Sequence, residues 1–160
     1  MPNTACWAQQ CKDTIQSSAT EGRFIPLNDG TVIDRAGYLI WMRCSVGQYW
    51  DNDKKICIGS PTILTWRQAR QSADHQAQLS KAPWRLPSIQ ELSSIAEMRC
   101  VDPAIDLRVF PNTPAMHYWT STPFVNQDEH FWLLQFLTGE NNTDSIKRAA
   151  LVRLVKSVQK

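Results

Sequence analysis

Thiol groups are the most reactive side chains of this sequence, which contains five cysteines: Cys6, Cys11, Cys44, Cys57 and Cys100. No two of them have the Cys-x-x-Cys spacing, and no histidine lies at zinc-finger distance from a cysteine pair. The spacing therefore argues against a structural zinc site. Disulfide formation is the chemistry that best explains these residues.

A disulfide between Cys44 and Cys57 would close the short polar loop that they flank, which has few apolar side chains to hold it. Five choices of an unpaired cysteine and three pairings of the other four leave about fifteen connectivities open. Among them we favour Cys44–Cys57 together with Cys11–Cys100, which leaves Cys6 unpaired. Disulfides persist in oxidising compartments, so we expect an extracytoplasmic protein: periplasmic, at the cell surface or secreted.

Histidines and carboxylates offer little further chemistry. His117 and His130 fall in segments that we expect to pair as strands, where they could face each other, although stacked strand histidines are more often structural. Asp102 and Asp106 lie in an expected loop, where turn or capping roles suffice. The sequence contains no Gly-rich phosphate loop, no Gly-x-Ser-x-Gly and no His-Glu-x-x-His motif. We therefore expect no catalysis. An enzyme of unfamiliar type ranks last of the three functions that we consider, after a binding module and an assembly subunit.

Size and composition are those of one globular domain, with 160 residues, 42% of them hydrophobic and 20% charged. No stretch approaches the roughly 18 consecutive apolar residues of a membrane helix, and the net charge of +2 selects neither nucleic acid nor membrane. The first six residues lack a charged n-region and an apolar h-region, so we expect no signal peptide in this chain.

The end of the chain is basic. Five cations and no acid follow Asp144, namely Lys147, Arg148, Arg153, Lys156 and Lys160. We interpret them as a solvated basic strand end. The alternative is a patch for anionic ligands.

Local patterns predict the elements of the fold. Asn28-Asp29-Gly30 joins two β-prone runs and is typical of a hairpin, because Asp-Gly tolerates positive φ. A second turn at residues 35–37 leads into an expected strand over residues 38–42. Capping boxes at Thr65–Gln68 and Ser88–Glu91 predict two helices. Their expected apolar faces are formed by Trp66, Ala69, Ala73 and Ala77 in the first helix and by Ile89, Leu92, Ile95 and Ala96 in the second.

The second half of the chain is predicted to be irregular, because Pro103, Pro111, Pro114 and Pro123 interrupt it. Short strands are expected over residues 117–121, 130–137 and 149–155. The last strand should place Leu151, Arg153 and Val155 on one face, and residues 139–142 should form a turn. Strands at both ends and two helices between them indicate an α+β class with antiparallel sheets and long irregular loops. Residues 1–22 are a polar leader, which Cys11 could tether, and residues 23–160 form one domain.

An ordered set of short motifs then resembles a known family. The motifs are Asp29-Gly30-Thr31-Val32-Ile33-Asp34, Trp41-Met42-Arg43-Cys44, Trp84-Arg85-Leu86-Pro87 with Glu91-Leu92, Pro103-Ala104-Ile105, Phe110-Pro111-Asn112-Thr113-Pro114, Tyr118-Trp119-Thr120-Ser121-Thr122-Pro123 and Val152-Arg153-Leu154-Val155. This set is similar to the Lcl C-terminal-domain-like family of bacterial domains, most of unknown function. The resemblance spans roughly Phe24 to Lys156. Ala36-Gly37-Tyr38 departs from it, since a Thr-Gly pair is common at that position.

The resemblance implies a variant of the C-type lectin-like fold, related to that of formylglycine-generating enzymes. In the adhesin that gives the family its name, the domain is associated with sulfated glycans and with trimers, so an oligomer is possible. Lectins of this fold that bind sugars through calcium carry the motifs Glu-Pro-Asn or Gln-Pro-Asp and Trp-Asn-Asp, and none of these occurs here. The oxidase members of the fold need a reactive cysteine pair late in the chain, whereas this chain has only Cys100 beyond Cys57. We expect no cofactor. Calcium at Asp51-Asn52-Asp53 or Asn141-Asn142-Thr143-Asp144 is a minor alternative.

Surface recognition is the function that these observations favour. We expect an exported binding or adhesion module for a glycan or protein ligand at the cell surface or on an appendage such as a pilus. The candidate ligand-binding residues are Trp50, Asn126, Gln127, Asp128, Asn141, Asn142, Lys147 and Arg148. Trp119 and Trp132 should be mainly core. The alternative function is a structural or assembly subunit of a surface, secretion or pilus complex.

Overall fold

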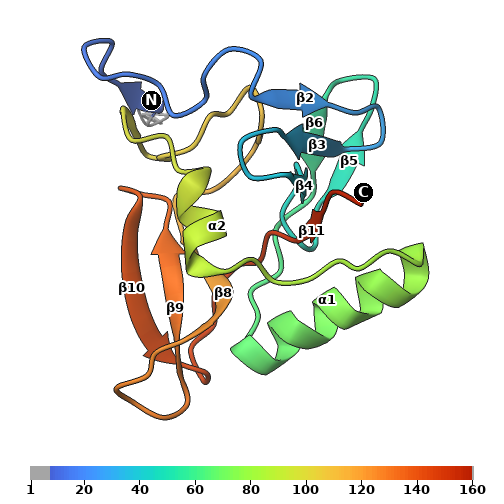
Figure 1. Ribbon diagram of the computed structural model, residues 1–160, viewed down its shortest axis with the longest axis vertical. Coiled ribbons are helices and arrows are strands. Elements are labelled where there is room, and N and C mark those ends of the chain that lie inside the picture. Colours follow the sequence, from blue (N-terminus) through green and yellow to red (C-terminus); the bar gives the residue numbers. More distant parts are fainter. Residues whose placement is uncertain (1–7, 160) are drawn as a thin grey trace, which may run out of the picture.

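The computed structural model describes residues 8–159, in which two helices and four small antiparallel sheets are arranged as Figure 1 shows. The helices are α1 (Trp66–Ser80) and α2 (Ile89–Ser94). The strands are β1 (Gln10–Cys11), β2 (Phe24–Pro26), β3 (Thr31–Asp34), β4 (Leu39–Met42), β5 (Tyr49–Asp51), β6 (Ile56–Ile58), β7 (Cys100–Val101), β8 (His117–Pro123), β9 (His130–Gln135), β10 (Glu140–Ser145) and β11 (Val155–Ser157). The predicted α+β class is confirmed.

Both predicted capping boxes are present. The Thr65 hydroxyl accepts the backbone N–H of Gln68 at the start of α1, and the Gln68 side chain accepts the Thr65 N–H in return. Ser88 and Glu91 make the same reciprocal pair at the start of α2. These bonds satisfy N–H groups that a helix leaves without partners at its N-terminus, and therefore fix where each helix begins.

The predicted hairpin forms between β2 and β3, which belong to a four-stranded sheet of order β11-β4-β3-β2. Gly30 ends its turn at φ +82°, a conformation that favours glycine. A methyl group at this position would lie 2.6 Å from Cβ of Trp50. Glycine is thus required here both by the backbone and by the neighbouring β5–β6 hairpin.

The interior is divided into two cores. The first lies between the four-stranded sheet, α2 and the sheet of order β10-β9-β8, and includes Trp41, Leu92, Tyr118 and Leu134. The second packs under α1 and consists of Ala69, Ala73, Trp84, Leu86, Trp119, Leu133, Ala150, Val152 and Leu154. Trp119 is fully buried and Trp132 is partly buried against the first core, so both belong to the interior as predicted.

Residues 150–155 run between these cores. Leu151 and Val155 point into the first core, whereas Ala150, Val152 and Leu154 point into the second. The predicted alternation is therefore present, but the regular strand is confined to Val155–Ser157. The preceding residues change partners along their length, from Leu64 to the β8 backbone and then to Val46, so no continuous ladder forms.

The sheet β10-β9-β8 corrects two sequence predictions. The turn before β10 spans residues 136–139 and not 139–142, because Gly139 takes φ +85° and its N–H closes the turn on the Gln135 carbonyl at 2.8 Å. His117 and His130 do not face each other. The register places His117 opposite Gln135 in the β8–β9 pair and His130 opposite Ser145 in the β9–β10 pair, so the two histidines lie at opposite ends of β9.

Two disulfides hold the chain together, and they are the pairs that the sequence analysis favoured. Cys11 and Cys100 are direct register partners across β1 and β7, with Cα atoms 4.0 Å apart. Cys44 and Cys57 join the end of β4 to β6, with Cα atoms 5.5 Å apart. Cys6 lies outside the described residues.

The described part of the leader is also bound to the body by hydrogen bonds. The side-chain amide of Gln9 donates to the carbonyl oxygens of Pro103 and Ile105 at 2.7 and 2.6 Å. The buried carboxylate of Glu97 accepts from the Ser17 hydroxyl and the Ser18 N–H. Burial alone would raise the pKa of Glu97, but these hydrogen bonds outweigh it and the pKa is lowered.

Arg153 corrects the interpretation of the C-terminal cations as a solvated strand end. Its side chain is fully buried and donates to the carbonyl oxygens of Met42 and Arg43 and to the hydroxyl of Thr113. Arg43 is nearly as buried and donates to two carbonyls of the segment before Phe110. Burial lowers the pKa of both guanidinium groups. Backbone carbonyls thus take the place of carboxylates around them.

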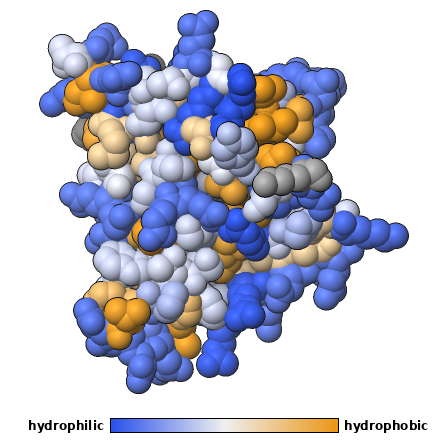
Figure 2. All heavy atoms as spheres, viewed as in Figure 1, coloured by the Kyte–Doolittle hydropathy of each residue, from blue (hydrophilic) through white to orange (hydrophobic). Residues whose placement is uncertain are grey.

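The face shown in Figure 2 is mostly hydrophilic, with apolar side chains at several places, one of them the region of β2 and β3. Ile25, Tyr38 and Val158 are among the exposed apolar and aromatic residues there, and Tyr38 is 76% exposed.

Candidate functional site

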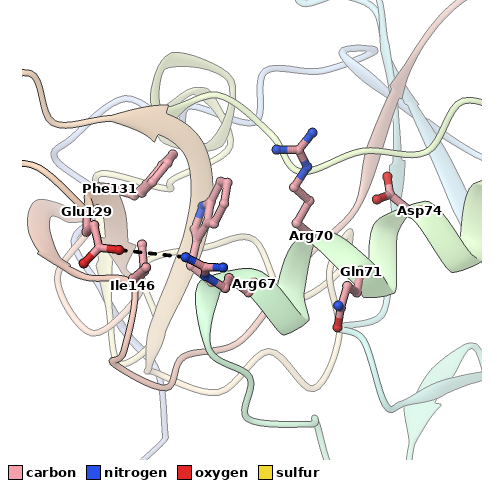
Figure 3. Close-up of a pocket in the computed structure, with 8 residues that line it drawn as sticks. Arg67, Arg70, Gln71, Asp74, Glu129, Phe131 and Ile146 are labelled. Carbon is pink, nitrogen blue, oxygen red and sulfur yellow. Dashed lines mark ion pairs between the residues drawn. The ribbon is translucent and has the colours of Figure 1, made fainter.

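A groove runs between α1 and the ends of β8 and β9. It has two adjoining parts of about 550 and 450 Å³ that share Trp66, Arg70, Asp74 and Phe131. We call it the α1 groove; Figure 3 shows its first part. Its other lining residues are Arg67, Gln71, Ala73, Arg85, Leu86, Ser121, Pro123, Glu129 and Ile146.

Two stacked aromatic rings form the floor of the α1 groove. Trp66 is the first residue of α1, and its indole N–H donates to the Thr120 carbonyl at 3.0 Å, which fixes the plane of the ring. The ring of Phe131 from β9 stacks on it with centroids 3.9 Å apart and planes 23° from parallel. A rigid, partly exposed aromatic surface of this kind is suited to stacking against an apolar face of a ligand.

Charged side chains surround this floor. Arg67 and Glu129 form an exposed ion pair at 3.8 Å, marked in Figure 3. At the other end, hydrogen bonds from Arg85 lower the pKa of the Glu91 carboxyl, and the pKa of Arg85 is raised in return.

Arg70 and Asp74 lie on the same side of α1, one turn apart (Figure 3). Among residues 8–159 neither has an ion-pair partner within 4.0 Å. The Arg70 guanidinium lies over the Trp66 ring, 5.9 Å from its centroid. The α1 groove therefore presents one cation and one anion whose charges no ion pair with another described residue neutralises.

The predicted loop residues do not form one surface. Asn126, Gln127 and Asp128 are exposed in the loop between β8 and β9. Asn141 and Asn142 lie in β10 opposite Leu134 and Leu133, near the turn at the other end of β9. The two sets are consequently separated by the length of the strand. The loop borders the α1 groove only through its last residue, Glu129.

The predicted cations have different environments. Arg148 is held by Asp144, with Nη1 2.6 Å from Oδ2, and its Nη2 lies 3.1 Å from Nδ1 of His117. Burial and the Arg148 charge lower the pKa of His117. Lys147 is exposed and follows Ile146, which lines the groove. Arg148 is thus already paired, and Lys147 lies beside the groove without lining it.

Trp50 is half-buried in β5, away from the α1 groove. The Arg43 guanidinium covers its ring at 4.3 Å from the centroid, and its indole N–H donates to Asn52 at 3.2 Å. Asn52 also accepts from Lys55, and the Asp51 carboxylate accepts two backbone N–H groups of its own turn. One ring face is therefore occupied, and these loop oxygens stabilise the turn.

Within the described part of the chain, no three His, Cys, Asp or Glu residues are close enough to bind a metal ion together. No helix over residues 8–159 has the length and apolar character needed to cross a membrane.

The sequence analysis counted Trp66 only as part of the apolar face of the helix. Trp66 does pack against the second core, but its partly buried ring also lines the α1 groove. The available signal was the spacing of Trp66, Arg70 and Asp74, which puts all three on one side of a helix. Phe131 carried no such signal, since only tertiary packing brings it to Trp66.

The chain is thus a disulfide-linked α+β domain with an open, aromatic-floored groove. The family model described as the Lcl C-terminal domain matches residues 30–156, from the β2–β3 turn to β11, and the chain belongs to this family. A comparison with curated proteins finds no matching relative.

Proposed function

We propose that this protein is an extracytoplasmic binding module of C-type lectin-like fold that recognises a glycan or protein ligand through the α1 groove without catalysing a reaction. The observation that carries the proposal is the Trp66–Phe131 stack beside the charges of Arg70 and Asp74, which no ion pair among the described residues neutralises. Aromatic rings that present a face and a few oriented polar groups are the usual elements of a binding site. The two disulfides support an oxidising compartment.

The test is binding by matched variants on an array of sulfated, uronic, neutral and peptide ligands. Arg70→Ala/Asp74→Ala alters the groove only at exposed positions, so the variant should fold. Arg35→Ala, in the exposed turn after β3, is the control. We expect at least one ligand class to be retained by the control and lost by the double variant. Identical ligand profiles for all three proteins would sink the proposal.

A second candidate, a structural or assembly subunit, is favoured by the exposed apolar side chains over β2 and β3. Ile25, Tyr38 and Val158 are 43%, 76% and 38% exposed. Such a surface would be buried in an assembly. Sedimentation over a range of protein concentrations, compared with a Tyr38→Asp variant, tests it. Self-association that the substitution abolishes would support assembly, and a monomer at every concentration, with no partner co-purifying, would count against it.

A further inference from the structure

The charge balance of the α1 groove points to the class of its ligand. The ion pairs at its two ends neutralise Arg67 and Arg85. The remaining cation, Arg70, is accompanied by a remaining anion, Asp74. The groove therefore has no surplus of positive charge, which is the property that attracts a polyanionic chain.

The spacing of the groove residues is that of an extended peptide. Trp66, Arg70 and Asp74 follow each other at four-residue intervals on α1, so their Cβ atoms are about 6 Å apart from one to the next. Alternate side chains of an extended chain lie on one face about 6.6 Å apart. A peptide lying along α1 would thus present every second side chain to one of these three residues.

We propose that the α1 groove binds an extended peptide segment of a partner protein with three alternate side chains in the order apolar, acidic, basic. The apolar side chain packs on the Trp66–Phe131 stack, the acidic one pairs with Arg70, and the basic one pairs with Asp74. Side-chain pockets at alternate positions give a peptide-binding groove its specificity. This inference rests on the proposed function, because it names the ligand of the same groove.

The test uses fluorescein-labelled peptides of identical composition with Gly-Ser flanks. One carries Trp, Glu and Lys at alternate positions, and its partner carries Trp, Lys and Glu. Both are also made in reverse order, since the chain could run in either direction along α1. Their affinities are measured by fluorescence anisotropy at low and high salt.

Two of the four peptides have Glu at the central position, and the wild-type protein should prefer one of them according to the direction in which the chain runs. That peptide should bind about tenfold more tightly than the peptide in which its Glu and Lys are exchanged, because the exchange places like charges together at two exposed sites. The variant Arg70→Asp/Asp74→Arg keeps the net charge and should reverse this preference. Arg35→Ala should leave it unchanged. Circular dichroism establishes that each variant is folded.

A sulfated hexasaccharide and a neutral hexasaccharide are measured in parallel. Equal affinity of the wild type for both peptide orders overturns the peptide proposal. Binding of the sulfated sugar that Arg70→Ala abolishes, with no peptide binding, also overturns it but leaves the proposed function in place. If neither peptides nor sugars bind, both proposals fail.

Discussion

The guanidinium carbon of Arg153 lies 4.9 Å from the centroid of the Phe110 ring, and both side chains are fully buried. Three acceptors, two backbone carbonyls and the Thr113 hydroxyl, surround the same guanidinium. The charge is therefore stabilised by dipoles and an aromatic face, and it connects the β4–β5 segment to the segment after Phe110.

Replacing Arg153 by Met should lower the free energy of unfolding by about 2–5 kcal/mol, because the acceptors stay buried without donors. Urea denaturation followed by tryptophan fluorescence measures the change. Arg148→Met, at an exposed position, is the control and should change stability by less than about 1 kcal/mol. A stability of Arg153→Met equal to that of the wild type would contradict this account of the site.

Glu97 should make the stability depend on pH in the acidic range. Its folded-state pKa is depressed below the ordinary value of 4.5, so its contribution is full above that value and is lost as the pH falls through the folded-state pKa. Glu97→Gln should therefore destabilise the protein at neutral pH and remove part of the acid dependence. Thermal melts of both proteins on either side of pH 4.5 test this. Parallel pH profiles for the two proteins would refute it.

Gly30 and Gly22 form a matched pair for separating backbone strain from steric clash. Both have positive φ, but a methyl group at Gly30 would meet Trp50 whereas one at Gly22 would meet nothing within 4 Å. Gly22→Ala should lower stability by about 1 kcal/mol. Gly30→Ala should lower it by a further 1–3 kcal/mol or so, from overpacking. Equal losses in chemical denaturation would show that the Trp50 contact relaxes freely.

The two disulfides should differ in their sensitivity to mild reduction. Cys11 is exposed, whereas Cys44 and Cys57 are only 8% and 5% exposed. A reductant must reach a sulfur atom, so Cys11–Cys100 should open first. Timed reduction, alkylation and peptide mass spectrometry would identify the first labelled cysteines. Earlier labelling of Cys44 and Cys57 would show that local opening, not static exposure, controls the reaction.

Features encoded within a few residues were predictable from the sequence. The capping residues Thr65 and Ser88 and the Asp29-Gly30 hairpin depend on hydrogen bonds and backbone angles local to each motif. The turn before β10 was misplaced because Asn141 and Asn142 have turn-like character, although their side chains accommodate a strand paired with β9. Their local preference was outweighed by pairing across the hairpin.

Features that depend on distant packing were not predictable. Arginine is rarely buried without a carboxylate, so sequence reasoning placed Arg153 in solvent. The α1 groove exists because Phe131 of β9 stacks on Trp66 of α1, and no spacing within either segment indicates that contact. The predicted ligand residues were chosen as polar loop positions, and the sheet separates them.

The segment at residues 150–155 supplies side chains to both cores and follows nearly all of the residues that it packs against. A nascent polypeptide that lacks it leaves both cores unfilled, however much of the remainder has emerged. Cotranslational folding of this domain therefore stays incomplete until residues 150–155 have emerged, and products truncated before them are exposed to proteolysis.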